Sequence, residues 1–92
     1  MKQNDIINNR KKFHEDLFGY LFPRLNRPRS HIDKILYYVD NDNYLQILYT
    51  YQIETIRELL SYFLEVEDYN TCAIIRDVVL YHNKAVGTTY KL

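Results

Sequence analysis

The sequence predicts a mainly α-helical protein, a small bundle of about four helices that ends in an antiparallel helical hairpin. Two observations predict this fold class. Apolar residues recur at helical spacing along most of the chain, and residues that commonly start or stop helices flank these stretches. With 92 residues, we expect a single domain spanning 1–92, with flexible ends at 1–4 and 84–92.

The first expected helix covers residues 5–22, where apolar side chains form a broad stripe. Pro23 is expected to end this helix, because proline lacks the N–H that a helix interior requires, and a basic linker at 24–29 follows. The stripe consists of Ile6, Phe13, Leu17, Tyr20 and Leu21, with Ile7, Phe18 and Phe22 beside it.

A second helix is expected to start at Ser30, which forms a capping-box pair with Asp33. The polar run at 40–43 is expected to stop it. Its apolar positions have helical spacing, which predicts a buried face made of Ile32, Ile35, Leu36 and Val39.

Residues 44–53 fit two patterns. The alternation of Leu45, Ile47 and Tyr49 is typical of a strand, while overlapping apolar residues also satisfy helical spacing. An α+β alternative with a β-hairpin at about 35–51 therefore stays open. We favour a helix, chiefly because Ser30 and Asp33 cap the segment that precedes this stretch.

The expected hairpin closes the chain. Its first helix begins near residue 56 and ends near Val66, and its second begins after Asp68, a typical N-cap residue, and runs to about His82. A turn centred one residue before Asp68 would make Glu58 and Arg76 face each other as a partly buried ion pair.

The last helix is apolar around much of its circumference. We expect it to be covered from two sides, because its apolar residues form two faces. One face consists of Tyr69, Cys72, Ala73, Val79 and Leu80, and the other of Ile74, Val78 and Tyr81. One cover is its hairpin partner. The other is either the N-terminal helix or a second subunit, and the second alternative predicts a homodimer.

A motif occupies this last helix, and its members are Tyr69, Cys72, Ala73, Arg76, Asp77 and Val79. Residues 56–82 resemble the UVR motif, a helical hairpin through which nucleotide excision repair proteins and some unrelated bacterial proteins bind partners. This chain departs from the family pattern at Asn70, where glutamate is usual, and at Cys72, where alanine is usual. The resemblance implies a partner-binding hairpin, with contacts expected from Tyr69, Arg76, Asp77 and Tyr81.

The net charge is zero but unevenly distributed. Residues 1–34 hold eight basic and four acidic side chains, whereas residues 35–83 hold two basic and eight acidic ones. The basic side chains alternate with aromatic ones, which favours nucleic-acid binding as an alternative function. The acidic second half argues against it. The candidate nucleic-acid contacts are Arg10, Lys11, Lys12, Arg24, Arg27 and Arg29.

No catalytic, metal or cofactor site is expected. Cys72 is the single cysteine, which excludes a multi-cysteine metal site, and the three histidines, which we expect at the surface, lack metal spacing. The run at 40–43 has Leu45 and Tyr51 where a calcium loop needs glycine and glutamate. We therefore expect a cytoplasmic, non-enzymatic protein with no membrane span.

These observations predict a small protein-interaction module, an accessory or adaptor protein of the kind that phages and mobile elements encode. It would bind a larger partner protein through helical surfaces. The alternative is a small nucleic-acid-binding protein that uses the N-terminal basic segment.

Overall fold

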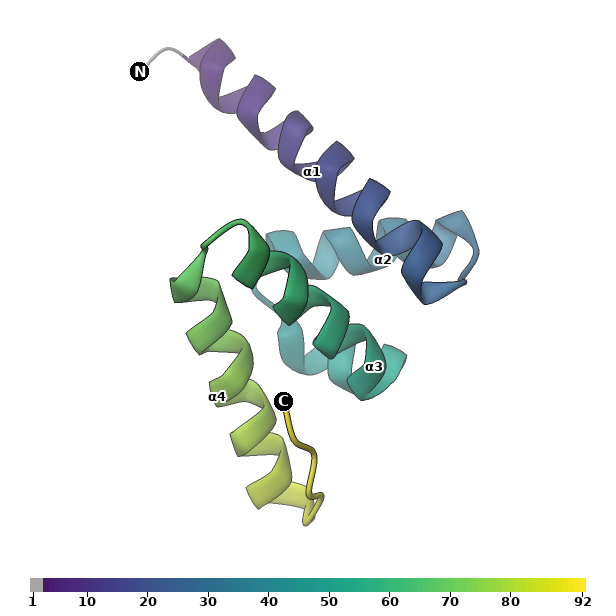
Figure 1. Ribbon diagram of the computed structural model, residues 1–92, viewed down its shortest axis with the longest axis vertical. Coiled ribbons are helices and arrows are strands. Elements are labelled where there is room, and N and C mark those ends of the chain that lie inside the picture. The colour runs from purple at the N-terminus through teal and green to yellow at the C-terminus, as the bar shows by residue number, and fades with distance from the viewer. Residues whose placement is uncertain (1–2) are drawn as a thin grey trace.

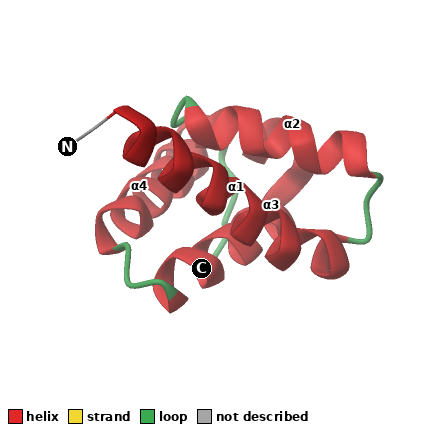
Figure 2. Cartoon of the chain, turned by 90° about the horizontal axis from the view of Figure 1, so that it is seen from above, coloured by secondary structure: helices red, strands yellow, loops and turns green. Residues whose placement is uncertain are grey.

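Four α-helices joined by short turns make up the chain (Figure 1). A computed structural model describes the backbone of residues 3–92 and the side chains of residues 9–92. The helices are α1 (Gln3–Leu25), α2 (Arg29–Asp40), α3 (Tyr44–Glu65) and α4 (Tyr69–Val86). Residues 3–92 contain no strand (Figure 2). The mainly α prediction is confirmed, and the alternative with a β-hairpin is wrong.

The start of α3 explains why this stretch is helical. The Asn43 side chain caps the helix by accepting a hydrogen bond from the backbone N–H of Gln46, at 3.3 Å. The side chains buried from this point recur every three or four residues, which is helical spacing and not the alternation of a strand. They are Tyr44, Ile47, Leu48 and Tyr51.

Two predicted helix boundaries are wrong at the α1–α2 connection. Pro23 lies inside the last turn of α1, which continues to Leu25. Helix α2 begins at Arg29 after Pro28, and no side chain caps it, so the expected Ser30 capping box does not form. Pro28 supplies the start instead, because its extended backbone (φ −57°, ψ 152°) directs its carbonyl to the N–H of the first helical turn.

Helix α3 is broken in its middle at Gln52. This residue has φ 72° and ψ 176°, a conformation that glycine adopts readily and other residues rarely. The break separates residues 44–51 from residues 53–65. Both ends of α3, Tyr44 and Phe63, consequently line the same cleft, which a straight helix of this length would not allow.

Helix α4 starts at the predicted N-cap. The Asp68 carboxylate accepts hydrogen bonds from the backbone N–H of Thr71 at 3.2 Å and from its hydroxyl at 2.7 Å. The helix continues past His82, where we expected its end, to Val86, and Gly87 closes it in the left-handed conformation with φ 75°.

The chain after Gly87 turns back along α3 and α4. The Asn83 side chain binds both the N–H and the carbonyl of Tyr90, at 3.0 and 2.9 Å. The Arg57 guanidinium donates to the carbonyl of Lys91 at 3.2 and 3.3 Å. These bonds attach the segment to the bundle. The flexibility expected for residues 84–92 stays a prediction. At the other expected flexible end, residues 1 and 2 lie outside the described part of the chain.

Helix α3 lies at the centre of the arrangement. It packs against α1, α2 and α4, whereas α3 is the one described helix that packs against α4 (Figure 1). The predicted buried face of α2 is confirmed at all four positions. In α1, Leu17 and Leu21 are fully buried, while the side chain of Ile6 lies outside the described residues. No helix within residues 3–92 combines the length and the apolar character needed to cross a bilayer.

Candidate functional site

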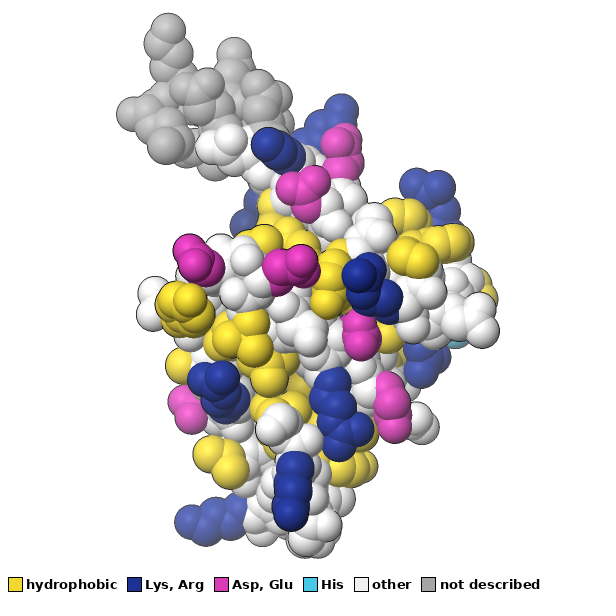
Figure 3. Space-filling model, in the orientation of Figure 1, with side chains coloured by type: hydrophobic (Ala, Val, Ile, Leu, Met, Phe, Trp, Pro, Cys, Tyr) yellow, Lys and Arg dark blue, Asp and Glu magenta, His cyan; other side chains and the backbone are white. Residues whose placement is uncertain are grey.

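The outward side of α4 carries large apolar side chains that nothing in the described chain covers. Tyr69, Leu80 and Tyr81 are 61%, 65% and 60% exposed, and Ile74 is 40% exposed. Hydrophobic side chains gather over this part of the molecule and alternate with charged ones (Figure 3). We call Tyr69, Ile74, Asp77, Leu80 and Tyr81 the α4 face.

The inward side of α4 packs on α3 through Cys72, Ile75 and Val79, all nearly inaccessible to solvent. Within the described chain, another helix covers α4 on one side only. Cover of the other side by a second subunit stays a prediction. The N-terminal helix does not reach α4 in the described part of the chain. The free thiol of Cys72 is buried in the interface between α4 and α3.

Three of the four predicted partner-binding residues, Tyr69, Asp77 and Tyr81, belong to the α4 face. Arg76 is also exposed and lies at the edge of this face, in a groove of about 440 Å³ beside the C-terminal segment that Leu80 and Tyr90 also line. The expected ion pair between Arg76 and Glu58 is wrong. Glu58 instead lies 3.8 Å from the Nε atom of Arg24, because Ile75 and not Arg76 faces α3.

The arginines of the candidate nucleic-acid segment already have partners within the chain. Their guanidinium carbons lie over aromatic rings, and the side chain of Arg24 also donates to the carbonyl of Tyr20, as that of Arg27 does to the carbonyl of Tyr51. A phosphate would have to compete with these contacts. The pairs are Arg24 over Tyr20 at 3.8 Å, Arg27 over Tyr51 at 5.2 Å and Arg29 over Phe18 at 4.7 Å.

The three remaining basic candidates all lie on α1. Arg10 lies 3.5 Å from the Asp40 carboxylate, while Lys11 and Lys12 are exposed on α1. The prediction that all three histidines lie at the surface is wrong for one of them. His82 is buried because its ring stacks on Tyr90, with ring centroids 5.6 Å apart.

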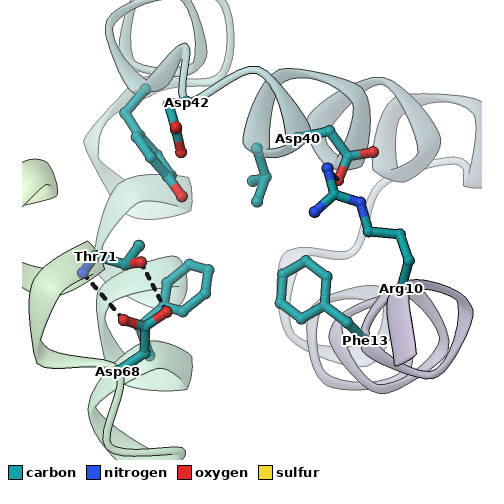
Figure 4. A pocket seen from close by; sticks show the side chains of 9 residues that line it. Arg10, Phe13, Asp40, Asp42, Asp68 and Thr71 are labelled. Atoms are coloured by element: carbon teal, nitrogen blue, oxygen red, sulfur yellow. Dashed lines mark hydrogen bonds and ion pairs between the residues drawn. The ribbon is translucent and has the colours of Figure 1, made fainter. Parts of the chain in front are cut away.

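A cleft of about 410 Å³ opens where α1, the α2–α3 turn and the start of α4 meet. Three carboxylates and three aromatic rings line it, together with one arginine (Figure 4). Asp40 and Arg10 lie on one side, and Asp42 and Asp68 lie on the other. The lining residues are Arg10, Phe13, Val39, Asp40, Asp42, Tyr44, Phe63, Asp68 and Thr71.

Sequence reasoning missed this cleft. Asp42 was interpreted only as part of a turn, and Asp68 only as a helix cap, because nothing in the sequence indicated the break at Gln52 that brings their turns together. The concentration of acidic residues in the second half of the chain was the one available signal.

No family model, curated protein or solved structure matches this chain.

Proposed function

We propose that this chain is a small protein-interaction module, an accessory protein that binds a larger partner protein through the α4 face. The observation that carries the proposal is the exposure of Tyr69, Leu80 and Tyr81 on a helix that packs against one neighbour only. Exposed tyrosines on a rigid helix are favourable contact residues, since they bury a large area at low cost in conformational entropy.

The resemblance of residues 56–82 to a partner-binding hairpin supports the same surface. Tyr69 and Asp77 belong to the motif that carries the resemblance, and both lie outward on α4. The charges on and beside the face, from Asp77, Arg76 and Lys84, are suited to a polar rim around an apolar centre.

Replacing Tyr81 by aspartate is expected to abolish capture of the partner from cells that express the protein naturally. Loss of one central aromatic contact costs about 2 kcal/mol or more, roughly a 30-fold loss of affinity, and a buried new charge adds to that. Tyr37→Asp is the matched control, because Tyr37 is 61% exposed on α2, far along the chain from α4. Quantitative mass spectrometry of the captured protein, with thermal unfolding of both variants, provides the measurement.

Equal capture by both variants, or a loss with Tyr37→Asp alone, would contradict the use of the α4 face. Light scattering of the wild type identifies one special case. A mass of about 22 kDa, twice that of the 11.2 kDa chain, that falls to the monomer mass in Tyr81→Asp would show a second copy as the partner. Salt-sensitive binding of a labelled oligonucleotide that both variants retain would favour the nucleic-acid alternative.

A further inference from the structure

The cleft is lined by more acidic than basic side chains, three aspartates and one arginine. Asp40 has two partners, Arg10 at 3.5 Å and the Nε2 atom of His14 at 2.8 Å. On the opposite wall, the Asp42 carboxylate makes no hydrogen bond or ion pair within the described chain, and the Asp68 carboxylate accepts hydrogen bonds only from Thr71. Two carboxylates therefore face the cleft without a cationic partner among residues 9–92.

The Tyr44 hydroxyl is a second, independent feature of this wall. The residue is 1% exposed, yet its hydroxyl makes no hydrogen bond within residues 9–92. Over the same residues, every fully buried side-chain nitrogen or oxygen atom has a partner, so the Tyr44 oxygen must open onto the cleft that the residue lines. Burial, and then the charges of Asp42, Asp68 and Asp40, raise the pKa of this hydroxyl, which keeps it neutral.

The arrangement suits an organic cation better than a metal ion. No three metal-binding side chains within the described residues are close enough together to hold one ion. The rings of Phe13, Tyr44 and Phe63 line the space between the acidic groups, and aromatic rings attract a flat, weakly hydrated cation. A guanidinium meets both requirements, since its several N–H groups can donate to two carboxylates while its flat face stacks on a ring.

We propose that this cleft binds the guanidinium group of an arginine side chain that a partner protein presents. Asp42 and Asp68 accept hydrogen bonds from the guanidinium, the Tyr44 oxygen accepts a third, and the aromatic rings contact its flat face. Arg10 shows the same recognition within the chain, because it reaches the cleft from α1 and pairs with Asp40. The site is separate from the α4 face, so it adds a second contact and does not depend on the first.

The test uses the full chain and N-acetyl-arginine amide as the probe, with N-acetyl-citrulline amide as its control. Citrulline has nearly the same shape but carries no charge. Backbone NMR shifts at Phe13, Tyr44 and Thr71 are expected to saturate with the arginine probe, at a dissociation constant of about 1 mM for a ligand of this size. The citrulline probe should bind at least about tenfold more weakly.

Two charge-removing variants are chosen to leave the fold unchanged. Asp42→Asn is compatible with φ 53° at this position, and Asp68→Asn retains an N-cap side chain. Each is expected to weaken the arginine probe about tenfold or more, whereas Asp33→Asn, at an exposed position on α2 away from the cleft, should leave it unchanged. Tyr44→Phe tests the hydroxyl alone and should weaken binding several-fold.

Equal binding of the arginine and citrulline probes, or equal binding by Asp42→Asn and Asp33→Asn, would overturn the proposal. Spermidine that shifts the same residues at a tenfold lower concentration would overturn the assignment to a protein side chain and identify a free polyamine instead. Tyr81→Asp, which alters the α4 face, should bind the arginine probe normally. Failure of the partner-capture experiment and failure of this one are thus distinguishable.

Discussion

Replacing Ile75 by alanine is expected to lower the free energy of unfolding by about 2–5 kcal/mol, because it deletes a fully buried side chain between α4 and α3. The same replacement at the adjacent Ile74 should cost less than about 1 kcal/mol, since that side chain is 40% exposed. The two changes are chemically identical and differ by one position on the helix, so they report which face of α4 is inside.

Urea unfolding followed by circular dichroism gives both values. Similar losses for the two variants would mean that α4 is rotated on α3, and a larger loss for Ile74→Ala would place the α4 face inside the bundle. Either result would also show that the α4 face is not exposed as the proposed partner binding requires.

Replacing Gln52 by glycine is expected to stabilise the protein by about 1–2 kcal/mol. Relief of the strained backbone should contribute about 1–3 kcal/mol, and the greater freedom of glycine in the unfolded chain offsets about 0.5–1 kcal/mol of that. For a domain of this size, each kcal/mol raises the melting temperature by roughly 4–8 °C.

Ser61→Gly provides the control, because Ser61 is exposed in the regular second half of the same helix. Glycine there should lower the melting temperature, since it only weakens the helix. If Gln52→Gly also lowers it, the helix is continuous at Gln52, and its two ends cannot meet at the cleft.

Local rules predicted much of this fold from the sequence. The four buried residues of α2 followed from their spacing, and the start of α4 followed from the capping chemistry of Asp68. The Ser30 capping box failed because Pro28, two residues earlier, already fixes the backbone for a helix start. Local rules fail where two of them compete within a few residues.

The break at Gln52 had no local signal, because neither glycine nor proline stands there. Packing of both halves of α3 against α1, α2 and α4 is what makes a strained residue tolerable at this position. The cleft was hard to predict for the same reason, because Asp42, Tyr44 and Asp68 come together only after the chain bends at Gln52.

The α4 face was predicted only in part. Ile74 and Tyr81 were correctly separated from the buried Cys72 and Val79, but Tyr69 and Leu80 were wrongly placed on the buried face.

The attachment of α4 to a single neighbour also has a dynamic consequence. A helix held by one interface can detach without disrupting the α1–α3 core, so its opening free energy should lie below that of global unfolding. Cys72, buried in that interface, reports the event, because its thiol becomes reactive only while α4 is open. Thiol labelling in native buffer should therefore be faster than global unfolding allows, and a partner bound across the hairpin should slow it. The labelling rate of the Cys72 thiol would then measure the free energy that holds α4 on α3.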